Sequence, residues 1–265
     1  MKLYSLGIDI GSITAKAVVL EVDNNSIVGS VIMPTGYNTK ETANKLVSKL
    51  LPQVDLIIDD IAYTISTGYS RKNVDFSTQQ VTEITCQAKG IFFLFPDAKT
   101  IIDIGGQDSK AIKVDSKGNM VDFEMNDKCS AGTGRFLEVM ARSLDVPLET
   151  MSALSTQDYV PISSTCTVFA ESEVVSRIAE GADRNSIIGG IHHSIASKIL
   201  SLVGRIDIEP RIVITGGVAK NKAVVDAIAE KLGHDVSVPE IPQLTGALGA
   251  ALIATKKIKK LNSKG

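Results

Sequence analysis

The sequence lacks several features that would point to a well-known class of protein. Its 265 residues include only three cysteines, none close to another, which argues against a disulfide framework and against a Cys-x-x-Cys zinc site. The formal net charge of −2 gives no electrostatic reason to expect nucleic acid or anionic lipid as a partner. No apolar run approaches the roughly 20 residues of a membrane span. We therefore expect a globular, cytoplasmic protein that binds no nucleic acid and no membrane.

The common nucleotide-binding motifs are missing too. There is no Gly-x-x-x-x-Gly-Lys-Ser/Thr loop, and the segment Gly132-Thr133-Gly134 lacks the third glycine of a dinucleotide fingerprint. The first residues lead straight into a strand-like segment that carries the charged Asp9, so we expect no signal peptide. A chain of this length forms one large domain or two moderate ones.

Apolar patterning predicts an alternation of strands and helices. Runs rich in β-branched residues predict strands, and apolar residues at three- and four-residue spacing predict helices. Strands are expected at 3–10, 14–22, 27–33, 56–65, 120–125, 211–215 and 236–238, and helices at 80–95, 185–206, 218–232 and 245–254. A further helix, with Ala43, Leu46, Val47 and Leu50 as apolar positions, is expected to be capped by Thr39 or by Thr42.

An internal repeat of the N-terminal segment begins near Thr100. The segment Ile102–Ile112 can be laid over Ile8–Val18 without a gap, at an offset of 94 residues. Both copies read as a strand, an Asp-Ile-Gly turn and a second strand, and the repeat pairs Asp9 with Asp103. A repeat of this length indicates a duplicated α/β unit. Two such units would place two glycine turns on a shared cleft.

Three glycine turns follow predicted strands: one at Gly11, one at Gly105-Gly106 and one at Gly216-Gly217. Without a Cβ, the backbone N–H groups of such turns can approach phosphate oxygens closely. Carboxylates such as Asp9 and Asp103 suit a magnesium ion held largely through water. Other polar side chains of these turns are within reach of a phosphate or of an attacking water, namely Ser12, Thr14, Lys16, Gln107 and Asp108.

Two cysteines stand before two predicted helices. Cys129 lies in a polar, glycine-bearing turn that precedes apolar residues at helical spacing, and Cys166 precedes a second such run. Helix N-termini carry partial positive charge and stabilise a thiolate or an anionic cluster bound to it. Cys86 differs because it falls within a predicted apolar helix face, and we interpret it as a buried residue rather than a ligand.

The Asp-Ile-Gly turns, the repeat and the Thr215-Gly216-Gly217 turn resemble the phosphate and adenosine motifs of the superfamily of actin, sugar kinases and heat-shock-chaperone ATPases. The resemblance implies an α/β protein with two duplicated actin-like (ribonuclease H-like) domains around a nucleotide cleft that binds ATP and Mg²⁺. The expected domains are 1–97 and 98–245, with a C-terminal helix at 246–258 that packs back on the first.

A narrower resemblance is carried by the segments 126–136, 162–173 and 245–251. They are similar to those of the activator ATPases of 2-hydroxyacyl-CoA dehydratases, and the likeness covers residues 3–254. It implies a homodimer with one [4Fe-4S] cluster, bound by Cys129 and Cys166 of each chain in a helix-cluster-helix at the dimer interface. It further implies that ferredoxin or flavodoxin supplies an electron, which the ATPase passes to the dehydratase.

The expected site follows from the turns and from this resemblance together. The residues expected to take part in ATP hydrolysis are Asp9, Asp103, Gln107 and Asp108, with Asp9 and Asp103 also binding Mg²⁺ through water. The residues expected to bind ATP are Gly11, Ser12, Ile13, Thr14, Lys16, Gly105, Gly106, Gln107, Gly132, Gly134, Gly216, Gly217, Val218 and Gln243.

Two positions depart from the pattern of that family. Ser70 stands where we expect glycine, and Gln87 stands where we expect histidine. The three histidines of the chain, His192, His193 and His234, lie outside any cluster of titratable groups, and we interpret them as surface or structural residues.

Four alternatives remain at this stage. The chain could be the ATPase subunit of a benzoyl-CoA reductase, or the reductase of a double-cubane cluster protein. It could be a small-molecule kinase with inert cysteines, although the sequence contains no insertion that builds an acceptor pocket. It could also be a non-enzymatic actin-like filament protein, which would contain no iron.

Overall fold

The computed structural model of the chain describes residues 2–156, 158–163 and 166–263. It divides into two compact units. Unit 1 comprises Met1–Ala98, Val114–Met120 and Gln243–Gly265, and unit 2 comprises Lys99–Lys113 and Val121–Pro242. Each unit is built around its own five-stranded sheet.

The sheet of unit 1 has the strand order β3-β2-β1-β4-β5. Strands β1 and β2 form an antiparallel hairpin, β3 continues it, and β4 runs parallel to β1 on the other side. The strands are β1 (Tyr4–Ile10), β2 (Thr14–Glu21), β3 (Ile27–Pro34), β4 (Ile61–Thr67) and β5 (Gln79–Gln80).

The sheet of unit 2 repeats this topology, with the order β10-β9-β6-β7-β8. Here β6 and β7 form the antiparallel hairpin and β9 runs parallel to β6. The strands are β6 (Thr100–Ile104), β7 (Ser109–Val114), β8 (Met120–Asn126), β9 (Ile212–Thr215) and β10 (Val236–Ser237). The duplicated α/β unit inferred from the sequence repeat is therefore present, strand for strand.

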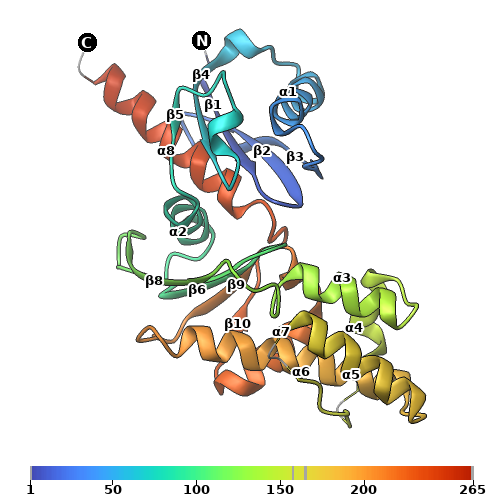
Figure 1. Ribbon diagram of the computed structural model, residues 1–265. Coiled ribbons are helices and arrows are strands. Elements are labelled where there is room, and N and C mark those ends of the chain that lie inside the picture. The colour runs from blue at the N-terminus through green and yellow to red at the C-terminus, as the bar shows by residue number, and fades with distance from the viewer. Residues whose placement is uncertain (1, 157, 164–165, 264–265) are drawn as a thin grey trace. The chain divides into compact units, whose positions relative to one another are not determined.

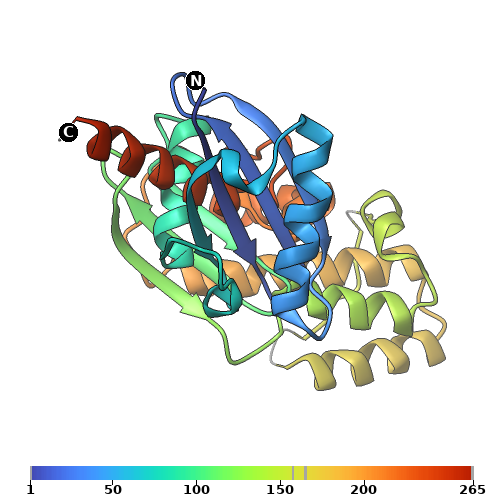
Figure 2. The same ribbon diagram turned by 90° about the horizontal axis from the view of Figure 1, so that it is seen from above.

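Helices cover both faces of the first sheet. Successive side chains of a strand point to opposite faces, and those of β1 are buried on both. Leu6, Ile8 and Ile10 pack with α1, whereas Ser5 and Gly7 contact α8. Figures 1 and 2 show α1 and α8 against this sheet. The helices of unit 1 are α1 (Thr39–Leu50), α2 (Glu83–Leu94) and α8 (Thr245–Asn262), with short 3₁₀ turns η1 (Leu51–Val54), η2 (Ile58–Asp60) and η3 (Arg71–Asn73).

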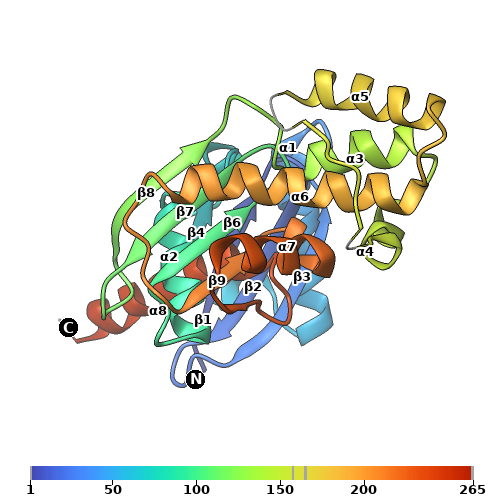
Figure 3. The same cartoon turned by 90° about the horizontal axis from the view of Figure 1, so that it is seen from below.

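Unit 2 carries a larger set of helices, of which α6 and α7 lie along its sheet in Figure 3. Among the described residues, α6 is the one helix long and apolar enough to span a membrane by composition, and 67% of that stretch is buried within the protein. The helices are α3 (Gly134–Ser143), α4 (Met151–Leu154), α5 (Thr167–Ala179), α6 (Arg184–Val203) and α7 (Lys222–Leu232), with 3₁₀ turns η4 (Leu148–Thr150) and η5 (Val218–Lys220).

Two predicted boundaries were wrong. The strand expected at 56–65 begins only at Ile61, because the Asp60 carboxylate accepts a hydrogen bond from the Ile57 N–H and closes a 3₁₀ turn. The helix expected from residue 80 begins at Glu83, because Gln79–Gln80 pairs with β4 as an edge strand. Pairing with a neighbouring strand is a long-range effect that the local pattern does not contain.

The helices α2 and α8 cross at direct backbone contact. A Cβ added to Gly249 would lie 1.7 Å from the Cys86 carbonyl oxygen, and one added to Gly90 would lie 2.0 Å from the Thr245 carbonyl oxygen. Glycine at both positions lets the two backbones touch. This crossing holds the N-terminus of α8 in place, next to Asp9.

We predict that Gly249→Ala destabilises the protein although alanine favours a helix more than glycine does. The added methyl group must push the two helices apart, at a cost of roughly 1–3 kcal/mol. Urea unfolding followed by circular dichroism measures the change. Ser48→Ala, on the exposed face of α1, is the matched control and should leave the midpoint nearly unchanged; an equally stable Gly249→Ala protein would contradict the close crossing.

Candidate functional site

The first glycine turn joins β1 to β2 and is closed by a hydrogen bond from the Gly11 N–H to the Thr14 carbonyl oxygen, at 3.1 Å. Asp9, 3% exposed, lies at the end of β1 just before it. The Lys16 ammonium group lies 3.2 Å from Asp9 Oδ2 and keeps 13% of its side chain exposed. The turn therefore has backbone N–H groups, one accessible cation and one buried carboxylate, with Ser12 and Ile13 at its tip.

The second oxygen of Asp9 fits a hydrated cation. Asp9 Oδ1 is buried and has no hydrogen-bond partner among the described residues. Gly68 and Gly246 approach the carboxylate closely without covering it with a side chain, since a Cβ on Gly68 would lie 2.3 Å from Oδ1 and one on Gly246 3.0 Å from Oδ2. A buried carboxylate oxygen without a protein donor calls for a partner, and a water on Mg²⁺ supplies one.

The second turn has the same backbone geometry, because the Gly105 N–H donates to the Asp108 carbonyl oxygen at 2.9 Å. Its cation is placed differently. Lys110, which matches Lys16 in the repeat, is 1% exposed and lies 2.9 Å from Asp108 Oδ2 and 3.6 Å from Asp103 Oδ2. Lys110 therefore forms ion pairs with the carboxylate of Asp103, at the end of β6, and with that of Asp108, in the turn, whereas Gln107 is exposed at the tip of the turn. Our sequence reasoning missed Lys110, although the repeat aligns it with Lys16.

The third turn lies against the second. Gly216 has a left-handed φ of +88°, and its N–H donates to the Pro242 carbonyl oxygen at 3.1 Å. A Cβ on Gly216 would lie 2.6 Å from Asp103 Oδ1, so only glycine permits this approach. The contact brings Gly217 and Val218 to the side of Asp103, and Gln243 follows Pro242 directly in the chain.

The first turn of α3 is hydrogen-bonded to the second glycine turn. The Gly134 N–H donates to the Gly105 carbonyl oxygen at 2.9 Å, and the Arg135 N–H donates to the Gly106 carbonyl oxygen at 2.8 Å. Gly132, with a φ of +86°, bends the chain into this position. Two N–H groups that normally lack partners at a helix start thereby join α3 to the Gly105-Gly106 turn.

The two cysteines meet their helices in different ways. Cys166 is the N-cap residue of α5, as the sequence pattern predicts. Cys129 lies five residues before α3, so its expected place at a helix mouth was wrong: Thr133 is the N-cap, and the first N–H groups of α3 bind Gly105 and Gly106 instead. Both cysteines are half-buried free thiols.

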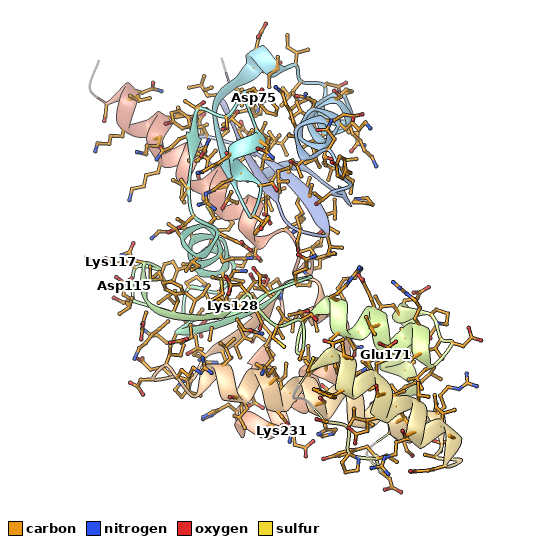
Figure 4. The ribbon with its side chains drawn as sticks, viewed as in Figure 1. Asp75, Asp115, Lys117, Lys128, Glu171 and Lys231 are labelled. Carbon is orange, nitrogen blue, oxygen red and sulfur yellow. The ribbon has the colours of Figure 1, made fainter. Side chains whose placement is uncertain are left out.

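Hydrogen bonds join the two cysteine segments within the chain. Ser130 Oγ, beside Cys129, lies 2.9 Å from Thr167 Oγ1, beside Cys166. Farther along, Ser143 of α3 donates to the Glu171 carboxylate of α5 at 3.2 Å, and Glu171 is labelled in Figure 4. No group of three or more Cys, His, Asp or Glu side chains suited to a metal occurs in the described part of the chain. Two thiols are half of a four-cysteine ligand set.

Cys86 and Gln87 belong to the crossing of α2 and α8. Burial raises the pKa of the Cys86 thiol to about 12, which keeps it protonated and opposes a role as a thiolate ligand. The Gln87 Oε1 accepts a hydrogen bond of 2.6 Å from Thr245 Oγ1, at the first residue of α8. Gln87 thus ties α2 to the helix whose N-terminus lies beside Asp9.

Comparison with known proteins identifies the family of the chain. The sequence model of the BadF/BadG/BcrA/BcrD ATPase family matches residues 6–254. The chain belongs to this family. The activator of lactoyl-CoA dehydratase from Anaerotignum propionicum is 52% identical over 260 residues, which cover 97% of this chain and 100% of that protein.

Two solved structures resemble this ATPase over nearly its whole length. Component A of the (R)-2-hydroxyglutaryl-CoA dehydratase of Acidaminococcus fermentans has a TM-score of 0.93 at 43% identity, covering 97% of this chain and 99% of that one. The activator of the 2-hydroxyisocaproyl-CoA dehydratase of Clostridium difficile, solved with bound ADPNP, also has a TM-score of 0.93 at 43% identity, covering 99% and 98%. The expected α/β fold with duplicated actin-like units is confirmed, and the protein is an ATPase.

A buried histidine supports the loop after Gly216-Gly217 in this ATPase. His192 of α6 is 1% exposed, and its Nε2 lies 3.2 Å from the amide nitrogen of Asn221, the N-cap of α7. Its Nδ1 lies 3.0 Å from Ser155 Oγ. Burial, with a smaller effect of His193, lowers the pKa of His192 to about 4. The interpretation of His192 as a structural residue agrees with this placement.

We predict that His192 makes the ATPase acid-sensitive. Its folded pKa of about 4 lies below the ordinary 6.5, so the unfolded chain binds the proton first as the pH falls. Stability is then lost from pH 6.5 downward, and the loss reaches up to about 3 kcal/mol near pH 4. Urea midpoints measured from pH 7.5 to 4.5 test this. His192→Gln should be less stable at pH 7.5 but flatter with pH; parallel curves for both proteins would refute it.

Proposed function

We propose that this ATPase activates a 2-hydroxyacyl-CoA dehydratase by transferring one electron to it at the expense of ATP. The similar proteins of Anaerotignum, Acidaminococcus and Clostridium are named as activators or components of such dehydratases. The observation that carries the proposal is the pair of hydrogen bonds from α3 to the Gly105-Gly106 turn. They join a segment that bears a cysteine to a segment that binds phosphate.

The polar side chains of the glycine turns have separate roles in this proposal. Asp9 and Asp103 are each proposed to bind Mg²⁺ through water, and Lys16, which keeps an exposed fraction, neutralises phosphate charge. Gln107 and Asp108, at the second turn, orient the attacking water. Lys110 fixes the Asp108 carboxylate for that task, because a buried ammonium at 2.9 Å restricts its rotation. ATP hydrolysis of this kind depends mostly on positioning and electrostatic stabilisation.

The thiols of Cys129 and Cys166 are proposed to bind one [4Fe-4S] cluster together with the same two residues of a second copy. The exposed face of α5 supports a homodimer, since four apolar side chains there lie in solvent: Val168, Phe169, Val175 and Ile178, exposed by 66%, 67%, 55% and 45%. This face begins next to Cys166, so a partner helix packed on it brings in a second Cys166. A two-fold axis makes such a contact with one surface used twice.

The cluster, when bound, supplies a site that accepts and gives up one electron at low potential. We propose ferredoxin or flavodoxin as the electron donor and the cytoplasm as the location. The protein controls the environment of the thiols, because a shift of the Gly105-Gly106 turn between ATP and ADP states pulls on Gly134 and Arg135. The Ser130–Thr167 hydrogen bond passes the shift to the segment of Cys166. Changes in hydrogen bonding and solvent exposure near a cluster alter its reduction potential.

Serine substitutions test the ligand set. Cys129→Ser and Cys166→Ser, each purified anaerobically, should lose the visible absorption of the cluster and most of the iron, which is roughly two atoms per chain for one four-iron cluster per dimer. Both proteins should still hydrolyse ATP, since neither thiol belongs to the glycine turns.

Cys86→Ala is the matched control, because its thiol is buried in the α2–α8 crossing and should leave the iron content unchanged. A full four-iron cluster in either serine variant would overturn the ligand assignment. A wild-type protein that elutes as a monomer with its iron bound would overturn the shared site.

A further inference from the structure

Two loops of unit 1 present the same three residues in the same way. Thr35-Gly36-Tyr37 follows β3, and Thr67-Gly68-Tyr69 lies at the end of β4. The threonines are 3% and 0% exposed, whereas Tyr37 is fully exposed and Tyr69 is 81% exposed. Both glycines are left-handed, with φ of +64° and +89°. Each loop therefore buries its threonine, turns at its glycine and places a tyrosine ring in solvent.

Both loops are hydrogen-bonded to the Gly11 turn, from its two sides. Thr35 donates from Oγ1 to the Gly11 carbonyl oxygen at 2.8 Å and from its N–H to the Ile13 carbonyl oxygen at 2.9 Å. In the other loop, the Ser70 N–H donates to the Ile10 carbonyl oxygen at 3.0 Å. The sheet order explains this arrangement, since the strand of each loop lies on a different side of the β1–β2 hairpin.

The second loop also touches the buried carboxylate of the site. A Cβ on Gly68 would lie 2.3 Å from Asp9 Oδ1 and 2.6 Å from the Ile10 carbonyl oxygen. The backbone that carries Tyr69 therefore packs directly on Asp9. A ligand that binds to Asp9 and shifts its carboxylate would therefore also shift Gly68, the residue directly before Tyr69.

Further contacts join the two loops into one surface. The Asn73 amide donates to Thr39 Oγ1 at 2.6 Å, and Lys40 forms an ion pair with Asp75, which is labelled in Figure 4. Lys72 is exposed nearby, and Arg71 donates to the Gly68 carbonyl oxygen at 3.2 Å. Four cations, Lys40, Lys45, Arg71 and Lys72, thus stand against two carboxylates, those of Glu41 and Asp75, so these residues carry a net positive charge.

Single exposed aromatic rings are common and need no explanation. The rings of Tyr37 and Tyr69 differ from such isolated cases, because they lie on two matching loops that are both hydrogen-bonded to the Gly11 turn. A ring as exposed as that of Tyr37 has little protein around it, so it does not line a concave pocket for a small ligand. It suits insertion into a pocket of another protein, where tyrosine is enriched among the residues that carry binding energy.

We propose that Tyr37 and Tyr69 form a docking surface for the dehydratase, and that this surface responds to the nucleotide. The inference rests on the proposed function, which requires an acceptor protein. The acceptor face should present pockets for the two rings and carboxylates opposite Lys40, Arg71 and Lys72. Because both loops bind the Gly11 turn, phosphate binding there repositions the rings. Docking strength then differs between the ATP and ADP states.

The experiment uses the anaerobic holoprotein and the purified lactoyl-CoA dehydratase of Anaerotignum propionicum as the probe. The measured quantity is the concentration of ATPase that gives half-maximal dehydratase activation in excess ATP. Tyr37→Ala and Tyr69→Ala should each raise it at least about tenfold, the size of effect typical of an interface hot spot. The double phenylalanine variant should keep most of the wild-type potency, because the ring is retained. Iron content and melting temperature are measured on every sample.

Leu261→Ala is the matched control, since this side chain is 61% exposed on unit 1 but lies at the end of α8; it should behave as wild type. If alanine variants activate at the wild-type concentration, the docking surface is wrong and the proposed function stands. If they raise KM for ATP in parallel, the rings act on the nucleotide and the inference is overturned. If the wild-type protein neither binds nor activates the dehydratase, both the inference and the proposed function fail.

Discussion

Two backbone hydrogen bonds link the glycine turn of unit 2 to the segment that bears Cys129, one from Gly134 N–H to the Gly105 carbonyl oxygen and one from Arg135 N–H to the Gly106 carbonyl oxygen. They attach the start of α3 to the Gly105-Gly106 turn, which is proposed to bind phosphate, and the acceptor carbonyl groups are themselves held in place. Lys110 is fully buried against Asp103 and Asp108, so the turn behind the carbonyl groups is rigid. Breaking a buried ion pair leaves an unpaired charge and costs free energy. The turn is therefore expected to keep its ion pairs with Lys110 and to move as a rigid unit.

The same pair of units uses its duplicated turns for different tasks. In unit 1 the lysine of the repeat, Lys16, stays partly accessible, and the neighbouring loops lead outward to Tyr37 and Tyr69. In unit 2 the matching Lys110 is locked inside, and the neighbouring segment leads to Cys129. In our two proposals, the Gly11 turn transmits the nucleotide state to the docking surface of Tyr37 and Tyr69. The Gly105-Gly106 turn transmits it to the thiols of Cys129 and Cys166.

The sequence predicts a large part of this arrangement because a repeat preserves topology. The offset that aligns Asp9 with Asp103 also aligns Gly11 with Gly105, and both glycines make the same backbone hydrogen bond. Long-range contacts were harder to predict. The local sequence does not show that Gln79–Gln80 pairs with β4 or that α3 begins only at Gly134. It also gives no sign that Lys110 is buried, because lysine is rarely fully buried. The repeated Thr-Gly-Tyr loops are visible in the sequence, but their exposure is not.

Amide hydrogen exchange on the anaerobically purified protein, compared between ADP and ADPNP, is the sharpest test of the proposed coupling between the Gly105-Gly106 turn and the cysteine segments. We expect the amides of Gly134 and Arg135 and the peptide 126–136 to change their exchange rates between the two nucleotides. Helix α1 should exchange equally in both states. If residues 126–136 exchange at the same rate with ADP and ADPNP while the Gly105-Gly106 turn responds, the hydrogen bonds to α3 do not transmit the nucleotide state to the cysteines, and the proposed coupling is wrong.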